Sequence, residues 1–235
     1  MSQDDKVGDD GRLVVAINGG PRKNWNTFLL LEEALRGASD AGARTLRYDL
    51  FEMNFKGCVS CFYCKTKENY HKGKCAQKDD LAPVLKTLKD ATGLVMGSPI
   101  YLSDVTGSLR NFWERYVFQN IIYSNTEQSV LERGPGMGVI YTMNIPEDMM
   151  PVMNYDILLS SHFYFLERLN PPILEQICSC DTLQFNDYDK YYAPMFNSEA
   201  KKRSRELEFP GDLHKAYELG FRLGQVKEKQ RIRNA

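Results

Sequence analysis

The sequence lacks the features that mark several specialised classes of protein. Thirty basic and thirty-one acidic side chains leave a formal net charge of −1, so no excess of one sign indicates a nucleic-acid or anionic-membrane surface. No apolar run approaches the roughly 18 residues of a membrane span, and residues 1–10 contain no apolar signal core. We therefore expect a cytoplasmic protein without nucleic-acid or membrane partners.

Common catalytic and nucleotide-binding motifs are missing as well. The chain has only three histidines and no G-x-S-x-G nucleophile elbow, which argues against a hydrolase. It contains neither the G-x-x-x-x-G-K-[ST] motif of a P-loop nor the G-x-G-x-x-G motif of a dinucleotide-binding fold. A phosphate site in this protein would therefore have to be built in another way.

The composition is that of an ordinary globular protein. The 235 residues are 43% hydrophobic and 26% charged, which is enough to bury a substantial core. Residues 1–11 are polar and are expected to form a disordered leader. No linker, repeat or low-complexity tract follows, so we expect residues 12–235 to form a single domain.

The clearest structural signal lies near the start of this domain. The uncharged residues 13–17 predict a strand that is buried on both faces, as in a parallel sheet. Gly19 and Gly20 then break the strand and allow a ligand to approach the backbone. A helix is expected to begin near Phe28.

The turn between this strand and this helix suits an anion. Unpaired N–H groups and the helix dipole converge at a helix start, and Arg22 and Lys23 add two positive charges. Asn24, Asn26 and Thr27 are expected to cap the helix. The segment predicts a phosphate site, although an ordinary strand-to-helix turn with solvated charges explains the same residues.

The rest of the chain alternates strands with helices. Strands are expected at 44–50, 93–97, 136–143 and 173–185, and helices at 81–90, 104–118, 151–169 and from about 212. This alternation predicts an α/β fold of three layers with a five-stranded parallel sheet. Such folds bind ligands at the carboxyl ends of their strands, which would bring together residues 18–27, 98–108 and 142–148.

A cysteine-rich loop is expected at residues 55–78. It carries four of the six cysteines in the pattern C-x2-C-x2-C-x10-C, namely Cys58, Cys61, Cys64 and Cys75. The first three have the spacing of ferredoxin-type cluster ligands, but four thiolates also suit zinc, and free thiols are a third interpretation. We expect Cys178 and Cys180, two apart on a strand, to be buried structural cysteines.

Several of these segments resemble one family. The motifs at residues 18–27, 57–64, 73–75, 79–80 and 97–101 are similar to those of the flavodoxin-like NAD(P)H-dependent FMN reductases, and within that group to those of the iron–sulfur flavoproteins. Residues 209–220 are similar to the closing helix of the family. The resemblance implies a flavodoxin-like sandwich and a homodimer or homotetramer.

The resemblance also implies where FMN would lie. Carried over by position, the contacts to its phosphate are Asn18, Gly20, Arg22, Asn24, Asn26 and Thr27. The flavin ring would lie against Ser98, Pro99, Ile100 and Tyr101, with Thr142 and Met143 at its other edge. The chain departs from the family at Gly20, where serine is common, and at Trp25, where a small residue is common.

We therefore expect an FMN-dependent oxidoreductase that accepts electrons from NAD(P)H and passes them on, with a [4Fe–4S] cluster on the cysteine loop. The flavin would supply the chemistry, so no side chain is assigned a catalytic role. One alternative is a cluster-free NAD(P)H reductase of quinones, nitro- or azo-compounds. Another is a non-enzymatic zinc-binding adaptor on a flavodoxin-like scaffold.

Overall fold

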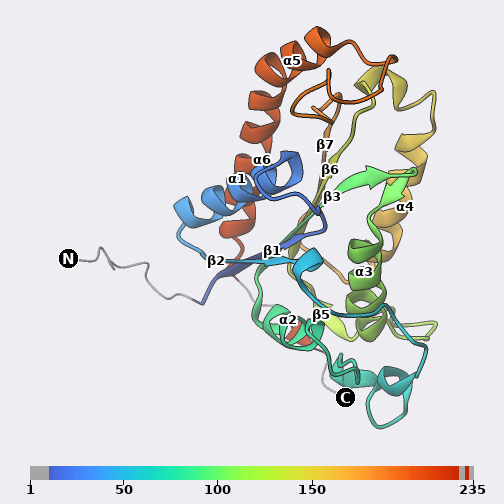
Figure 1. Cartoon of the computed structure of the whole chain (residues 1–235). Coiled ribbons are helices and arrows are strands. Elements are labelled where there is room, and N and C mark those ends of the chain that lie inside the picture. The colour runs from blue at the N-terminus through green and yellow to red at the C-terminus, as the bar shows by residue number, and fades with distance from the viewer. Residues whose placement is uncertain (1–10, 228–230, 233–235) are drawn as a thin grey trace.

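The centre of the fold is a parallel sheet of five strands. In the computed structural model, which describes residues 11–227 and 231–232, the strand order is β2 (Arg44–Asp49), β1 (Leu13–Asn18), β3 (Gly93–Tyr101), β6 (Gly136–Thr142) and β7 (Leu174–Ser179) (Figure 1). The short strand β4 (Asp104–Val105) folds back antiparallel on the end of β3. This is the doubly wound order of a flavodoxin-like fold, so the predicted fold class is confirmed.

Burial explains which segments became central strands. Every residue of β1 and β6 is buried, and none of them is charged. In β2, at the edge of the sheet, Arg44 and Leu46 are exposed. The fully buried strands and the half-exposed edge strand were both predicted from their hydrophobic patterns.

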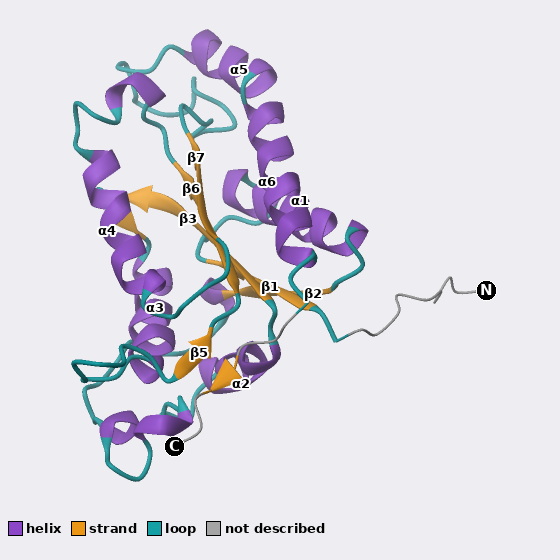
Figure 2. Cartoon of the chain, turned by 180° about the vertical axis from the view of Figure 1, so that it is seen from behind, coloured by secondary structure: helices purple, strands orange, loops and turns teal. Residues whose placement is uncertain are grey.

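Helices cover both faces of the sheet (Figures 1 and 2). One face carries α1 (Asn26–Asp40) and α6 (Phe209–Gly224), with α5 (Ser198–Leu207) packed on α6; the other carries α2 (Leu81–Thr87), α3 (Gly107–Asn120) and α4 (Tyr155–Glu167). Short 3-10 helices lie at Leu50–Glu52, Tyr63–Lys65, Tyr70–Lys72, Leu88–Asp90 and Glu147–Met149. A separate antiparallel pair joins β5 (Leu131–Arg133) to β8 (Arg231–Ile232).

The helices α1 and α6 touch through their backbones. A Cβ atom at Gly37 would lie 2.0 Å from the carbonyl oxygen of Tyr217, and one at Gly220 would lie 1.7 Å from that of Ala34. Only glycine permits this approach. The contact holds the second half of α1 against α6 on this face of the sheet.

Several predicted boundaries were wrong, and the helix expected at residues 151–169 spans Tyr155–Glu167. The helix expected from residue 104 begins at Gly107, because residues 104–105 pair with β3 and the Thr106 hydroxyl caps the helix by accepting a bond from Leu109 N–H (3.3 Å). β3 continues to Tyr101, and β7 ends at Ser179 rather than at 185.

Two features were missed or differ in kind. Trp25 occupies the N-cap position of α1, and no side chain caps this helix, contrary to the prediction for Asn24, Asn26 and Thr27. α5 was not predicted at all.

The expected disordered leader lies outside the described residues except for Gly11, and the single-domain assignment stays a prediction. None of the helices in the described ranges has the length and apolar character needed to cross a lipid bilayer.

Candidate functional site

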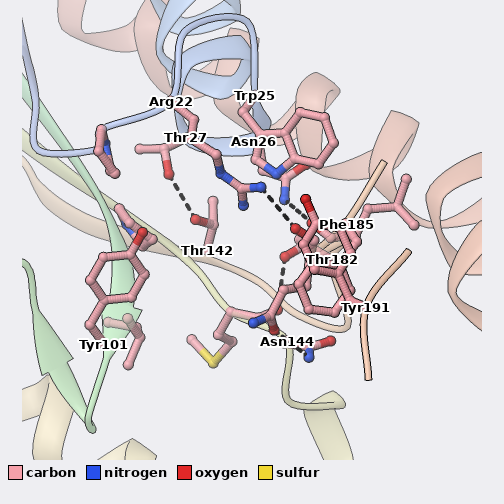
Figure 3. Close-up of a pocket in the computed structure, with 17 residues that line it drawn as sticks. Arg22, Trp25, Asn26, Thr27, Tyr101, Thr142, Asn144, Thr182, Phe185 and Tyr191 are labelled. Carbon is pink, nitrogen blue, oxygen red and sulfur yellow. Dashed lines mark hydrogen bonds between the residues drawn. The ribbon is translucent and has the colours of Figure 1, made fainter. Parts of the chain in front are cut away.

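A pocket of about 370 Å³ lies at the carboxyl edge of the sheet, where β1, β3, β6 and β7 end (Figure 3). Its walls come from the segments that follow these strands, within residues 20–27, 99–101, 142–144 and 182–191. This is the edge at which a doubly wound fold binds its ligand.

Most of the predicted cofactor contacts line this pocket. They are Gly20, Arg22, Asn26, Thr27, Pro99, Ile100, Tyr101, Thr142 and Met143. Asn18, Asn24 and Ser98 do not line it.

Asn18 shapes the turn instead of facing the pocket. Its side chain is buried, its Nδ2 donates to Asp49 Oδ1 (2.7 Å), and its Oδ1 accepts the N–H of Gly20 (2.9 Å). The N–H of Gly19 donates to the carbonyl oxygen of Gly97 (2.8 Å). The two glycine amides of the turn are therefore already paired within the protein.

Ser98 and Asn24 also lie away from the pocket walls. The Ser98 hydroxyl accepts the N–H of Thr106 (2.9 Å) and donates to the carbonyl oxygen of Pro99 (2.7 Å), which connects β3 to the start of α3. Asn24 is exposed and has a left-handed backbone, with φ of 54°.

The start of α1 provides the free donors of the site. No described residue accepts a hydrogen bond from the backbone N–H groups of Asn26, Thr27 and Phe28. These groups belong to the first turn of a 15-residue helix, where the helix dipole adds about half a positive charge. Such a helix start binds an anion when one is available.

Two arginines add uncompensated positive charge beside this helix start. Arg22 donates to the carbonyl oxygen of Gln184 (2.8 Å) and stacks on the ring of Trp25 at 4.5 Å, and Arg205 donates to Asn26 Oδ1 (2.8 Å). Burial lowers the pKa of both guanidinium groups from the ordinary value. Within the described part of the chain, neither of them forms an ion pair with a carboxylate. A bound anion would balance these charges.

Hydrogen bonds hold the walls of the pocket to one another (Figure 3). The hydroxyls of Thr27 and Thr142 lie 2.8 Å apart and join the start of α1 to the end of β6. Asn26 Nδ2 donates to the carbonyl oxygen of Leu183 (2.9 Å). Asn144 Nδ2 donates to the side chain of Gln184 (2.8 Å). The pocket is thus formed by the protein alone.

Aromatic side chains flank the pocket on two sides. Figure 3 shows Tyr101 on one side, and Phe185 and Tyr191 on the other. The rings of Phe185 and Tyr191 stack with centroids 4.4 Å apart and planes inclined by 17°. A planar aromatic ligand fits between such walls.

Two buried polar atoms of the pocket residues have no hydrogen-bond partner among the residues that the structure describes. They are Nε1 of Trp25, a donor, and Oδ1 of Asn144, an acceptor. Buried polar atoms are normally paired, so both atoms suit a ligand with polar edges. Trp25, which departs from the family pattern, thus forms part of the wall.

The segment at residues 182–191 was missed from the sequence. Thr182, Gln184, Phe185 and Tyr191 all line the pocket, as does Asn144. The predicted strand was extended to residue 185, which concealed the loop. The signal was present, because a fifth parallel strand ends at the same edge of the sheet as the others.

Comparison with known proteins identifies the family. Residues 13–145, more than half of the chain, match the family model described as NADPH-dependent FMN reductase. The chain belongs to this family. An iron–sulfur flavoprotein from Methanocaldococcus jannaschii is 35% identical to it over 102 residues, which cover 43% of this chain and 50% of that protein. The chain spans about half the length of the curated relatives it matches.

Solved structures show the fold of this FMN reductase family member in other proteins. An azoreductase from Bacillus anthracis strain Sterne superimposes with a TM-score of 0.65 at 11% identity, covering 90% of this chain and 99% of that one. An FMN-dependent NADH-azoreductase from Bacillus anthracis strain Ames Ancestor, in complex with FMN, gives a TM-score of 0.58 at 13% identity, with coverage of 91% and 99%.

The four cysteines of this reductase family member are not gathered around a common point. Cys64 is buried, Cys61 is exposed, and all six cysteines of the chain are free thiols. Among the residues that the structure describes, no three His, Cys, Asp or Glu side chains lie close enough together to hold a metal ion. The thiols as placed therefore fit neither a cluster nor a zinc ion.

The cysteine loop is held by α3. The side chain of Arg115 is fully buried, and its Nη1 donates to two groups. One is the carbonyl oxygen of Lys56 (3.3 Å), at the start of the loop, and the other is Asp79 Oδ2, directly after its end. Gln119 accepts the N–H of Cys75 through its side-chain oxygen (2.9 Å). Helix α3 therefore fixes the ends of the loop.

The remaining cysteines, Cys178 and Cys180, are half-buried and not fully buried as predicted. Burial raises the pKa of Cys178 to about 11 and that of Cys180 to about 12. Burial also raises the pKa of Cys64. A thiol with a raised pKa is a poor nucleophile, so these side chains suit packing better than reactivity.

Proposed function

We propose that the protein is an FMN-dependent oxidoreductase that accepts electrons from NAD(P)H. The observation that carries this proposal is the pocket at the carboxyl edge of the sheet. The start of α1, with its free N–H groups, and Arg22 lie in one wall, and the aromatic side chains of Tyr101, Phe185 and Tyr191 stand on two sides of the same pocket. A phosphate attached to a planar ring suits this combination of groups. Membership of the FMN reductase family supports the same ligand.

In this proposal the start of α1 and Arg22 bind the FMN phosphate, and Thr27 and Thr142 contribute hydroxyls. Residues 99–101 and Met143 lie along the ring. Asn18 and Ser98 keep the turns in place. FMN, when bound, supplies the two-electron chemistry, and the pocket residues bind it, orient it and exclude water.

A binding and reduction experiment tests this proposal. The purified protein is expected to show flavin absorbance or to bind added FMN, and the bound flavin is expected to bleach when NADPH or NADH is added without oxygen. Comparing the two donors gives the nicotinamide preference. Protein that shows no flavin absorbance and does not bind FMN would contradict the proposal.

We also propose that Cys58, Cys61, Cys64 and Cys75 bind a [4Fe–4S] cluster. Their spacing and the iron–sulfur flavoproteins among the relatives support it. No three of these thiols are placed to share a metal among the described residues, so binding would require the loop to rearrange around the cluster. Iron, sulfide and zinc analysis of anaerobically purified protein tests this, with Cys178→Ser as a variant outside the loop.

The outcomes separate the alternatives. Four irons and four sulfides per chain are expected for the cluster. Yellow protein without iron would favour a cluster-free reductase of quinones, nitro- or azo-compounds, an activity class found among the structural neighbours. Bound zinc without flavin would favour the other alternative, a non-enzymatic zinc-binding adaptor on a flavodoxin-like scaffold.

A homo-oligomer in the cytoplasm completes the proposal. Ile157, Leu158 and Tyr164 leave 64%, 41% and 71% of their surfaces exposed on α4, which supports self-association. Light scattering on the purified protein is expected to give twice or four times the mass of 27.0 kDa. A monomer at micromolar concentration would contradict this part.

A further inference from the structure

The helix α5 sends two basic side chains towards the loops of the pocket. Lys201 and Arg205 are four residues apart and therefore lie on the same face of the helix. Lys201 donates to the carbonyl oxygen of Asn144 (2.8 Å) and forms an ion pair with Asp181. Arg205 donates from Nη1 to Asn26 Oδ1 (2.8 Å). Each cation thus contacts a different wall of the pocket.

The two cations differ in how their charge is balanced. Asp181 neutralises the charge of Lys201, which is buried. Among the described residues, no carboxylate forms an ion pair with Arg205. Its guanidinium lies over the ring of Phe209, with Cζ 3.7 Å from the centroid. The ring fixes the position of the guanidinium and leaves its charge available to the pocket.

Asn26 connects Arg205 to the anion site. It is the first residue of α1, and its own backbone N–H has no acceptor among the described residues. Its side-chain oxygen accepts the bond from Arg205, and its Nδ2 donates to the carbonyl oxygen of Leu183 (2.9 Å). With both ends of the amide engaged, Asn26 keeps one orientation. Arg205 therefore acts on the helix start through Asn26 and through its charge.

We propose that Arg205 is a positioning residue for the flavin phosphate: it orients Asn26 and supplies the second positive charge that balances the dianion, so that the protein prefers FMN to riboflavin. The proposal rests on FMN binding, as proposed above. The chemistry requires only that the phosphate of FMN carries negative charge and that riboflavin, with the same ring, carries none.

Binding of the two flavins tests this role. Wild-type protein and the variants Arg205→Ala, Arg205→Lys, Lys201→Met and Lys202→Ala are titrated with FMN and with riboflavin, and quenching of flavin fluorescence gives the dissociation constants. Lys202→Ala is the matched control, because Lys202 is the neighbour of Lys201 on α5, is exposed, and pairs only with the exposed Glu199. A thermal melt of each variant checks folding.

We expect Arg205→Ala to weaken FMN binding about tenfold and to change riboflavin binding less than about twofold, as for the loss of one charge-assisted interaction. Arg205→Lys, which keeps the charge but loses the planar fork, is expected to fall between wild type and Arg205→Ala. Lys201→Met removes a neutralised cation, so any loss should be equal for both flavins. Increasing salt should weaken FMN binding more in wild type than in Arg205→Ala.

The outcomes distinguish this inference from the proposed function. Equal losses of FMN and riboflavin binding in Arg205→Ala, or no loss of either, would overturn the role of Arg205 while leaving FMN binding intact. A wild-type protein that binds neither flavin would overturn both. If Arg205→Ala does not fold, the test is the ratio of FMN affinity to riboflavin affinity in Arg205→Lys. A ratio equal to that of wild type overturns the inference.

Discussion

The pocket and the cysteine loop were both predicted as ligand sites from the sequence, yet the structure brings together only the residues of the pocket. In the pocket, side chains from four separate segments meet and are joined by hydrogen bonds such as Thr27 to Thr142. In the loop, four thiols lie within eighteen consecutive residues, and they are not gathered. Closeness in sequence is therefore a weaker guide to a site than a shared edge of the sheet.

The difference lies in what surrounds the donor atoms. The pocket forms where parallel strands end, so the sheet itself fixes the distances between its walls. Helix α3 holds the loop at its ends through Arg115 and Gln119, and Lys65 in its middle donates to the carbonyl oxygens of Phe118 and Ile121. The same middle part contains Ser60 and Phe62 with left-handed φ angles of 52° and 53°. The structure therefore preforms the pocket at the edge of the sheet, whereas a metal in the loop would have to bring its thiols together.

The largest expected effect removes the support of the pocket. Gly220→Ala places a Cβ 1.7 Å from the carbonyl oxygen of Ala34, so α6 must move away from α1. We expect the free energy of unfolding to fall by at least about 4 kcal/mol, measured by denaturant titration, and FMN binding to be lost with it.

Gly211→Ala is the matched control for this substitution. Gly211 lies in the same helix, and an added Cβ there meets nothing within 4 Å. Its better helix propensity should leave stability unchanged or raise it by less than about 1 kcal/mol. Equal stability of the two variants would show that the contact between α1 and α6 does not support the pocket.

The next effect acts on the cysteine loop. Asp79→Ala leaves the fully buried guanidinium of Arg115 without its carboxylate, and Nε and Nη2 of this arginine already lack partners. We expect a loss of about 3 kcal/mol in the free energy of unfolding, together with faster reaction of Cys64 and Cys75 with a thiol reagent.

Glu199→Ala, which breaks the exposed pair with Lys202, provides the comparison and should cost less than about 1 kcal/mol. If Asp79→Ala leaves both the thiol reaction rates and the stability unchanged, Arg115 does not hold the ends of the loop. FMN binding should survive in Asp79→Ala, since the pocket does not depend on this pair.

Hydrophobic patterns predicted the sheet better than they predicted the surface of the pocket. Residues 13–17 and 136–143 form buried strands as expected, because an uncharged run has no other stable place in a fold of this size. α5 was missed, because its residues present no apolar stripe; it is held by long cationic side chains, and Lys201 is buried among polar partners. No periodicity in the sequence reports such a contact.

The candidate site was predicted in part for the same reason. Pro99, Ile100 and Tyr101 directly follow a predicted strand, so topology placed them at the pocket. Asn18 has a side chain suited to phosphate but is used to hold the turn. Phe185 could be placed only once the end of β7 was known. Residue type indicates what a side chain can bind, and only tertiary contacts decide what it does bind.

A smaller effect concerns the contact between α3 and the turn of the pocket. The buried Thr106 hydroxyl donates to the carbonyl oxygen of Gly19 (2.7 Å) and accepts the N–H of Leu109 (3.3 Å). Thr106→Val keeps the shape and leaves both groups unpaired, so we expect a loss of about 2 kcal/mol in the free energy of unfolding.

This variant also sharpens the comparison, because α3 connects the two regions. Weaker FMN binding with unchanged thiol reactivity would show that the helix transmits nothing from the pocket to the loop. Thr106→Ser, which keeps the hydroxyl, should restore most of the stability. A Thr106→Val protein as stable as wild type would contradict the prediction.

The smallest effect is a dependence on pH at the pocket side. His162 is buried; its Nδ1 lies 3.0 Å from the hydroxyl of Tyr141 and its Nε2 lies 3.1 Å from Asp104 Oδ1, beside the hairpin that follows Tyr101. Burial lowers the pKa of His162, an effect that outweighs the nearby Asp104 carboxylate. A neutral ring with its proton on Nε2 satisfies both bonds, with the Tyr141 hydroxyl as donor.

The sign of the effect follows from this lowered pKa. The unfolded chain binds a proton at His162 below about pH 6.5, whereas the folded protein resists it, so the contribution of His162 to stability is complete above that pH and is lost as the pH falls below it. Between pH 7 and pH 5 we expect the free energy of unfolding to fall more in wild type than in His162→Gln, as measured by denaturant titration at each pH. His214→Gln, which replaces an exposed histidine, should keep the wild-type profile. If stability depends on pH in the same way in His162→Gln and in wild type, a neutral His162 does not help to hold the hairpin beside the pocket.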